Sequence, residues 1–331
     1  MRKLFLVPLA VACTLVVASA SAADVETIAF FDFAASEHPE SIQVDRHGHI
    51  YVSLAPRGEI RKIAPDGAQS TLAFLPLHQE VQPCENSAGS ASIAGIALDH
   101  QHNVYVNVRS CRAADFGIWK VTPDGQQSLV ANLPGNASPN GIAYHNGSLY
   151  VADSALALVW RVQARRVQAN GQSPVRLWTV DSLLRHPPSP PPGFPGPNGL
   201  QIFRDELYVS VSSRGHVVAF PINADGSAGP GRVHAMIGLD DFAFDVQGNL
   251  YAMTNFFNTV VRVTPDGATE TLLTLEDGLD GPSSGAFGGE NDRKNLYIAN
   301  AAFSFAPPPT PTPRRPSVMR LHIGIRGEPR P

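Results

Sequence analysis

Four side chains that can supply oxygen ligands to a cation recur at one place in a repeated sequence pattern. Glu40 begins "ESIQVD", Asn140 and Asn198 each lie in a Pro-Asn-Gly triplet, and Asp240 precedes "DFAFD". Carboxylate and amide oxygens without Cys or His select a hard cation, and a loosely constrained set of them suits Ca²⁺ better than Mg²⁺. Two carboxylates held together also raise each other's pKa unless a cation lies between them. The pattern therefore predicts a Ca²⁺ site.

Turn chemistry is the alternative explanation of the two Pro-Asn-Gly triplets, because Asn and Gly are frequent in turns. The occurrence of Glu40 and Asp240 at the same structural position favours the metal site. Asp241 is an alternative ligand to Asp240, although counting back from Tyr251 favours Asp240. The equivalent position falls on Ala94 in the second repeat and on Ser283 or Ser284 in the sixth.

The elements that position these residues follow from a repeat built around tyrosine. Six of the seven tyrosines end a similar phrase, such as "SIQVDRHGHIYVS", which has a short apolar run, a polar turn and a second apolar run, as in a β-hairpin. A second pair of runs joined by Asp-Gly follows most hairpins. The repeat tyrosines are Tyr51, Tyr105, Tyr150, Tyr208, Tyr251 and Tyr297, and they are separated by 54, 45, 58, 43 and 46 residues.

A repeat of this length with four strands predicts an all-β, six-bladed β-propeller. The sixth repeat has a third strand at Ser317 to Ile323 and lacks a fourth. We expect the segment from Val25 to Phe33 to supply that strand and close the ring. A tyrosine at one fixed place in every blade is expected to pack between blades rather than to bind a ligand.

The propeller explains why the oxygen ligands would meet. The innermost strand of each blade starts on one face of the disc beside the central axis, so the residue before it points toward the axis. Side chains at this position in six blades form a ring around one point. Glu40, Asn140, Asn198 and Asp240 come from four different blades and are expected to converge there.

The same residues carry a family resemblance. "HPESIQVD" at 38–45, the two Pro-Asn-Gly triplets at 139–141 and 197–199, and "LDDFAFD" at 239–245 resemble the SMP-30/gluconolactonase family of six-bladed propellers. The resemblance implies a catalytic Ca²⁺ on the axis held by Glu40, Asn140, Asn198 and Asp240, with Asp240 as base or nucleophile. Ser138 and Gly141 stand where sugar lactonases of the family usually have an Arg and an acidic residue, which puts sugar-acid lactones in doubt.

The function predicted from this site is hydrolysis of a small-molecule lactone or ester. The cation would polarise the ester carbonyl and stabilise the oxyanion, while Asp240 activates water or attacks directly. The competing hypothesis is a non-catalytic propeller that binds a partner and has a structural cation or none. His38, two residues before Glu40, is either a proton shuttle or an exposed loop histidine.

Export is predicted from the first 22 residues, in which Arg2 and Lys3 precede an apolar stretch and Ala-Ser-Ala resembles a cleavage site. The mature domain would then span 23–331, without stable membrane insertion and as a monomer. Cys84 and Cys111 remain after removal of this segment and are expected to form a disulfide in an oxidising compartment. The formal net charge of −4 and the lack of a basic block argue against nucleic acid as a partner.

Two proline-rich stretches interrupt the repeats, at 186–197 and 306–317. Both connections are expected on the face that carries the oxygen ligands. They form either stiff walls over the site or exposed linkers and docking segments for a partner.

Overall fold

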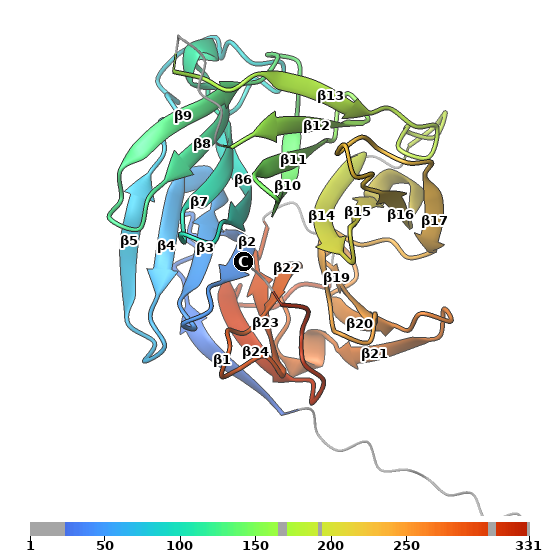
Figure 1. The fold of residues 1–331 in the computed structure, drawn as a ribbon. Coiled ribbons are helices and arrows are strands. Elements are labelled where there is room, and N and C mark those ends of the chain that lie inside the picture. Colours follow the sequence, from blue (N-terminus) through green and yellow to red (C-terminus); the bar gives the residue numbers. More distant parts are fainter. Residues whose placement is uncertain (1–23, 165–170, 191–193, 304–308, 330–331) are drawn as a thin grey trace, which may run out of the picture.

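Six four-stranded antiparallel sheets surround a central axis, so the chain is a six-bladed β-propeller, as the repeat predicts (Figure 1). The computed structural model describes residues 24–164, 171–190, 194–303 and 309–329. The predicted signal segment, 1–22, lies outside these residues. Within the described ranges, no helix is long and apolar enough to span a membrane.

The first three blades follow one another along the chain, with strands running from the axis outward. Blade 1 contains β2 (Pro39–Val44), β3 (Ile50–Leu54), β4 (Glu59–Ile63) and β5 (Gln69–Phe74). Blade 2 contains β6 (Ser92–Leu98), β7 (Val104–Arg109), β8 (Gly117–Val121) and β9 (Gln127–Asn132). Blade 3 contains β10 (Pro139–His145), β11 (Ser148–Asp153), β12 (Leu158–Gln163) and β13 (Val175–Thr179).

The remaining blades complete the ring. Blade 4 contains β14 (Pro197–Phe203), β15 (Glu206–Val211), β16 (His216–Pro221) and β17 (Arg232–Ala235). Blade 5 contains β18 (Phe242–Phe244), β19 (Leu250–Thr254), β20 (Thr259–Val263) and β21 (Thr269–Leu273). Blade 6 contains β22 (Pro282–Phe287), β23 (Asn295–Asn300), β24 (Ser317–His322) and β1 (Val25–Phe30). Short 3-10 helices occur at η1 (Ala55–Arg57), η2 (Ala113–Asp115), η3 (Ser212–Arg214) and η4 (Leu275–Asp277).

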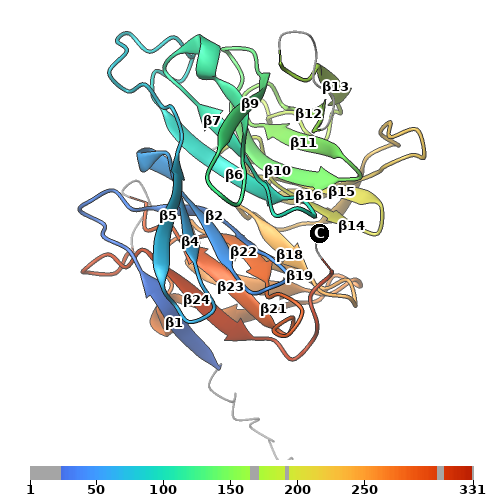
Figure 2. The same cartoon turned by 60° about the vertical axis from the view of Figure 1, so that its left-hand side comes forward.

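The N-terminal strand closes the ring, as predicted. β1 pairs antiparallel with β24, so the outermost strand of blade 6 comes from the start of the described chain (Figure 2). Pairing runs from Val25 opposite Leu321 to Phe30 opposite Ser317. This arrangement joins the two ends of the sequence through backbone hydrogen bonds and satisfies what would otherwise be an open sheet edge.

The repeat tyrosines pack between the blades, as predicted, and all six are at most 8% exposed. In blade 1 the Tyr51 hydroxyl donates to Asp45 Oδ2 at 3.2 Å, while Asp45 Oδ1 accepts the backbone N–H groups of His47 and His49. Blades 2 and 5 repeat this arrangement with their own Asp and Tyr. The aspartate therefore organises the hairpin turn, and the buried tyrosine hydroxyl keeps a hydrogen-bond partner.

Irregular pairing at the start of the inner strands places the candidate ligands. The register of β2 with β3 shifts between Pro39 and Ser41, and that of β10 with β11 shifts between Pro139 and Ile142. The same shift occurs in β14 after Pro197. A bulge leaves one residue out of the ladder and redirects its side chain. Glu40, Asn140 and Asn198 each lie in such a bulge.

The glycine of each Pro-Asn-Gly triplet is required by close packing of neighbouring inner strands. A Cβ atom on Gly141 would lie 2.3 Å from the carbonyl oxygen of Asn198, and one on Gly199 would lie 2.5 Å from Asp241 Oδ1. Neither glycine has a left-handed φ. The sequence interpretation, in which this glycine serves a tight turn, is therefore replaced by one of contact between adjacent blades.

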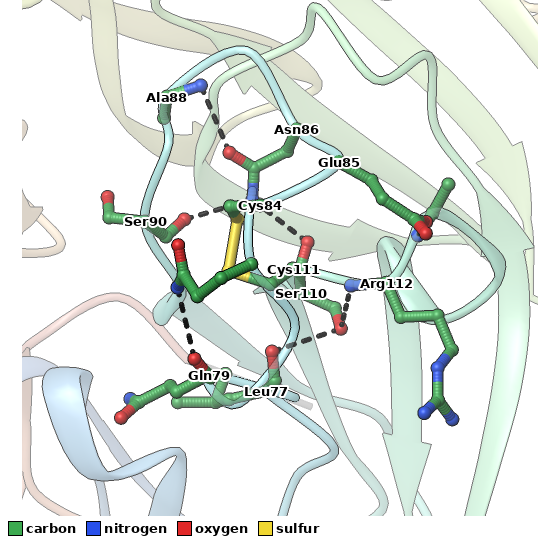
Figure 3. The surroundings of a disulfide bond; sticks show 12 residues. Leu77, Gln79, Cys84, Glu85, Asn86, Ala88, Ser90, Ser110, Cys111 and Arg112 are labelled. Carbon is green, nitrogen blue, oxygen red and sulfur yellow. Dashed lines mark hydrogen bonds between the residues drawn. A yellow bond between two sulfur atoms is a disulfide. The ribbon is translucent and has the colours of Figure 1, made fainter.

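The predicted disulfide between Cys84 and Cys111 is present and joins the connection before blade 2 to the end of its second strand (Figure 3). The Asn86 amide beside it donates to the carbonyl oxygens of Ser90 and Ser110, each at 2.9 Å. Cys111 also donates its backbone N–H to the Leu77 carbonyl oxygen at 2.8 Å. The bridge and these hydrogen bonds fix the long connection between blades 1 and 2 to the end of β7. The last residue of β7, Arg109, lies in the candidate site.

We expect loss of this bridge to destabilise the protein. Replacing both cysteines with serine opens a loop with a sequence separation of 27 residues, which should lower the free energy of unfolding by about 3 kcal/mol. Urea denaturation of oxidised protein and of the C84S/C111S variant measures the difference. A reductant should lower the stability of the parent protein and leave the variant unchanged. Equal stability of parent and variant would contradict the prediction.

Candidate functional site

A cavity of about 490 Å³ opens on the face of the disc where the inner strands begin. Its floor is formed by residues at the start of inner strands, and its walls come from the turns after the second strands and from the connections between blades. The polar residues in its lining are Glu40, Arg109, Ser138, Asn140, Ser154, His186, Asn198, Ser212, Asp240, Thr254 and Asn255. The apolar residues and glycine are Ala55, Ile93, Ala155, Phe194, Pro195, Gly238, Leu239, Phe256, Phe257 and Phe303.

All four residues predicted as ligands line this one cavity, although they lie up to 200 positions apart in the sequence. Glu40, Asn140 and Asn198 reach it from β2, β10 and β14, and Asp240 comes from the segment just before β18. Backbone hydrogen bonds of Asp240 and Asp241 with Met253 anchor that segment to β19. The structure thus brings the predicted set together from blades 1, 3, 4 and 5.

Two amides hold the Asp240 carboxylate in place. Asn198 Nδ2 donates to Asp240 Oδ1 at 2.7 Å, and Asn255 Nδ2 donates to Asp240 Oδ2 at 2.5 Å. Asn198 Nδ2 also lies 3.1 Å from Ser212 Oγ, and the Ser212 hydroxyl donates to the Leu239 carbonyl oxygen at 2.8 Å. Each carboxylate oxygen therefore accepts one amide hydrogen bond, which fixes its orientation in the cavity.

Burial and mutual repulsion disfavour negative charge on this group of carboxylates. Burial raises the pKa of Glu40 to about 7, the Arg109 guanidinium opposes this shift, and Asp241 adds to it. Burial also raises the pKa of Asp240 well above its ordinary value, with further contributions from the charges of Glu40 and Asp241. A hydrogen bond from Asn198 opposes that increase. The Arg109 charge balances one of the two carboxylates, so the ionisation of both would need a further positive charge in the cavity.

Two side-chain oxygen atoms of the predicted ligand set have no hydrogen-bond partner, as expected of atoms that could bind a cation. Glu40 Oε2 and Asn198 Oδ1 are buried and accept no hydrogen bond within the described structure. Such atoms are uncommon because leaving a buried acceptor unsatisfied costs about 1–3 kcal/mol. In the described ranges, no three His, Cys, Asp or Glu side chains cluster as metal ligands. A cation here would therefore depend on amide as well as carboxylate oxygens, a donor set that suits Ca²⁺.

Asp241 lies below the floor of the open cavity, on the side away from its opening. It lines a small deeper space near the axis together with Ser283 and Ser284, and it is not among the residues of the larger cavity. Its Oδ2 accepts a hydrogen bond from the Ser284 hydroxyl at 2.7 Å. Asp240 lines both spaces and Asp241 only the deeper one, so Asp240 is the carboxylate that faces the open cavity.

His38 is buried, which replaces the alternative of an exposed loop residue, and it is not among the residues that line the cavity. It is 9% exposed, and its Nδ1–H donates to the Ala301 carbonyl oxygen at 3.0 Å. Its ring packs edge-on against Phe33 and lies 6.4 Å from the Phe303 ring. Burial lowers its pKa, and through its contact with the Phe303 ring His38 packs behind the cavity wall.

The first proline-rich stretch contributes to the wall through its described ends. His186, Phe194 and Pro195 line the cavity, whereas 191–193 lie outside the described residues. The described part of the second stretch, 309–317, does not line it. The expectation that such connections wall the site is therefore supported for the first stretch alone.

A second ring of site residues was missed by the sequence analysis. The residue four positions after each repeat tyrosine lines the cavity in five of the six blades, and these residues are Ala55, Arg109, Ser154, Ser212 and Asn255. They begin the turns that follow the second strands, which end on the same face as the inner strands begin. Aligning the repeats on their tyrosines, as was done for the predicted ligands, would have found them. These residues follow the hairpin, whereas the predicted ligands precede it.

Comparisons with known proteins place the chain by its fold. No protein-family model matches the sequence, and no curated protein matches it. Among solved structures, a luciferin-regenerating enzyme matches with a TM-score of 0.65 at 14% identity, over 93% of this chain and 98% of the other. A gluconolactonase from Xanthomonas campestris matches with a TM-score of 0.62 at 17% identity, over 91% and 89%. A calcium-binding regucalcin from Agrobacterium tumefaciens matches with a TM-score of 0.61 at 16% identity, over 89% and 93%.

Each match covers most of this chain and most of the other protein, so the whole propeller is shared. The structural neighbours include gluconolactonase and regucalcin proteins of the SMP-30 group, the family that the sequence motifs resemble. Because the sequence identities are only 14–17%, these matches establish the common fold alone. The activity of this chain must be argued from its own cavity.

Proposed function

We propose that this protein is a Ca²⁺-dependent hydrolase of small lactones or esters. The observation that carries the proposal is the convergence of Glu40, Asn140, Asn198 and Asp240 on one open cavity, with two of their oxygens buried and unpartnered. These four residues would hold the cation. The similarity in fold to a gluconolactonase and to a calcium-binding regucalcin supports the same assignment.

The roles of the side chains follow from their hydrogen bonds. A bound Ca²⁺ would polarise the ester carbonyl and stabilise negative charge on its oxygen. Asp240 is the base that accepts a proton from the attacking water, or the nucleophile itself. Asn198 and Asn255 hold its two carboxylate oxygens, so that the group keeps one orientation through the reaction. Arg109, whose guanidinium lies beside Glu40, adds positive charge to the same cavity.

We also propose that the protein acts outside the cytoplasm. Its disulfide is typical of an oxidising compartment, and the first 22 residues have the composition of a secretory signal. Fractionation of expressing cells, with N-terminal sequencing of the mature protein, tests this part. Retention of an uncleaved N-terminus in the cytoplasmic fraction would contradict it.

Metal analysis combined with activity measurements tests the hydrolase proposal. Purified protein should contain about one Ca²⁺ per chain, as expected for a single axial site. It should hydrolyse at least one member of a panel of lactones, aryl esters and organophosphates, and a chelator should abolish that activity until Ca²⁺ is restored. Failure to bind Ca²⁺, or activity unaffected by the chelator, would contradict the proposal. Ca²⁺ binding without hydrolysis would favour the non-catalytic propeller.

A further inference from the structure

Four phenylalanine side chains contribute to the cavity walls. Phe194, Phe256, Phe257 and Phe303 all line it, and they come from three separate connections. The rings of Phe194 and Phe256 stack with centroids 4.2 Å apart and planes at 17°. Phe257 is 65% exposed, although it is a large apolar side chain. Exposed aromatic surface around a polar centre is typical of a site that binds an apolar ligand.

Three of the four hydroxyl side chains that line the cavity already have hydrogen-bond acceptors within the protein. The Ser154 hydroxyl donates to the Pro197 carbonyl oxygen at 2.6 Å, and the Ser212 hydroxyl donates to that of Leu239 at 2.8 Å. The Thr254 hydroxyl lies 3.0 Å from the Thr259 carbonyl oxygen. These donors hold the connections together and are not directed toward a ligand.

Several nitrogen donors of the walls are engaged in the same way. His186 Nε2 lies 2.9 Å from the Ser154 carbonyl oxygen, and the Asn198 and Asn255 amides donate to Asp240. A polyhydroxylated substrate loses its hydrogen bonds to water on binding and needs replacements for them from the site. Apart from the Arg109 guanidinium and the Asn140 amide, these walls offer few such replacements. An apolar ring has no such requirement and gains free energy by covering the phenylalanines.

We infer that the substrate is a lactone or ester with an aromatic or aliphatic body, which packs against the Phe194–Phe256 pair while its carbonyl group faces Asp240. The inference rests on the proposed hydrolase function and narrows its substrate class. A polyhydroxylated sugar lactone is the class that it excludes as the preferred substrate.

Two lactones of similar ring size separate the classes. With Ca²⁺ present, kcat/KM for dihydrocoumarin, an aromatic lactone, should exceed that for glucono-δ-lactone by at least about tenfold. The Phe256→Ala variant should lower kcat/KM for dihydrocoumarin by about tenfold, mainly through KM, because it removes a packing surface and no reacting group. Phe74→Ala is the matched control, since Phe74 is 52% exposed on the outer strand β5 and does not line the cavity. It should change neither parameter.

Binding of molecules that cannot be hydrolysed separates this inference from the hydrolase proposal. Calorimetry should show that 2-tetralone, the ketone analogue of dihydrocoumarin, binds the Ca²⁺-loaded protein and that Phe256→Ala weakens this binding about tenfold. The sugar ring 1,5-anhydrosorbitol should bind more weakly. Preference for glucono-δ-lactone, or tetralone binding that is insensitive to both Phe256→Ala and Phe194→Ala, would overturn the inference alone. Tetralone binding without hydrolysis of any probe would overturn the hydrolase proposal and leave the apolar cavity established.

Discussion

The Asp240→Asn variant is expected to hydrolyse the best substrate at least about a hundredfold more slowly than the parent protein, the usual scale for loss of an acid–base group. Asparagine keeps the size of the side chain and one carbonyl oxygen, but it has neither the charge nor the basicity of a carboxylate. Both oxygens of Asp240 accept amide hydrogen bonds. The new NH₂ group must therefore face another NH₂ donor unless Asn198 or Asn255 reverses its amide.

Asp241→Asn is the matched control for this experiment, because it makes the same chemical change one residue away. Asp241 accepts a hydrogen bond from Ser284 and lies outside the open cavity, and asparagine can keep an acceptor for that hydroxyl. Its turnover should stay within about threefold of the parent value. Circular dichroism and thermal unfolding should show an intact propeller in both variants. An Asp240→Asn protein that binds Ca²⁺ and keeps the parental rate would instead show that Asp240 is neither the base nor the nucleophile.

The blade architecture was predictable from the sequence because every blade repeats a hairpin with a buried tyrosine, and three blades also share a turn aspartate. A tyrosine hydroxyl and a turn aspartate recur six residues apart in "DRHGHIY", "DHQHNVY" and "DVQGNLY", and the structure pairs them in each case. Ring closure was predictable for a different reason. An unpaired edge in blade 6 needs a strand, and the apolar segment before blade 1 was long enough to supply it.

The candidate site was only partly predictable, because some of its residues occupy a repeated position of the sequence and others do not. Glu40, Asn140, Asn198 and Asp240 occupy one position of the repeat, so the repeat predicted their convergence. Arg109 and Asn255 occupy a second repeated position and could have been found in the same way. The Phe194–Phe256 stack has no such signal, because it joins an irregular connection to a hairpin turn of another blade.

The role of the triplet glycines was also beyond the sequence. A turn needs Gly for its own backbone, and that requirement can be inferred from adjacent residues. Gly141 and Gly199 instead make room for the inner strand of the next blade. Contacts of this kind depend on the distance between strands that are more than 40 residues apart, which only the assembled ring determines.

Ca²⁺ binding should release protons, and its affinity should fall as the pH decreases through about 7. In the metal-free protein, burial raises the pKa of Glu40 to about 7 and that of Asp240 well above its ordinary value. The cation binds the deprotonated carboxylates, so protons compete with it wherever these groups are protonated. Below the raised pKa values, each proton displaced should weaken the apparent affinity up to about tenfold per pH unit.

Calorimetric titration with Ca²⁺ at pH 6, 7 and 8, in buffers with different ionisation enthalpies, measures both quantities at once. Proton release per Ca²⁺ should be largest at pH 6 and smallest at pH 8, and the dissociation constant should decrease over the same range. Glu40→Gln should bind Ca²⁺ more weakly and release fewer protons, because it keeps a carbonyl oxygen but has no titrating group. Its hydrolytic activity should recover in part with excess Ca²⁺, unlike that of Asp240→Asn, since Glu40 acts only through the cation. A dissociation constant independent of pH, with no proton release, would mean that the two carboxylates do not hold the cation together.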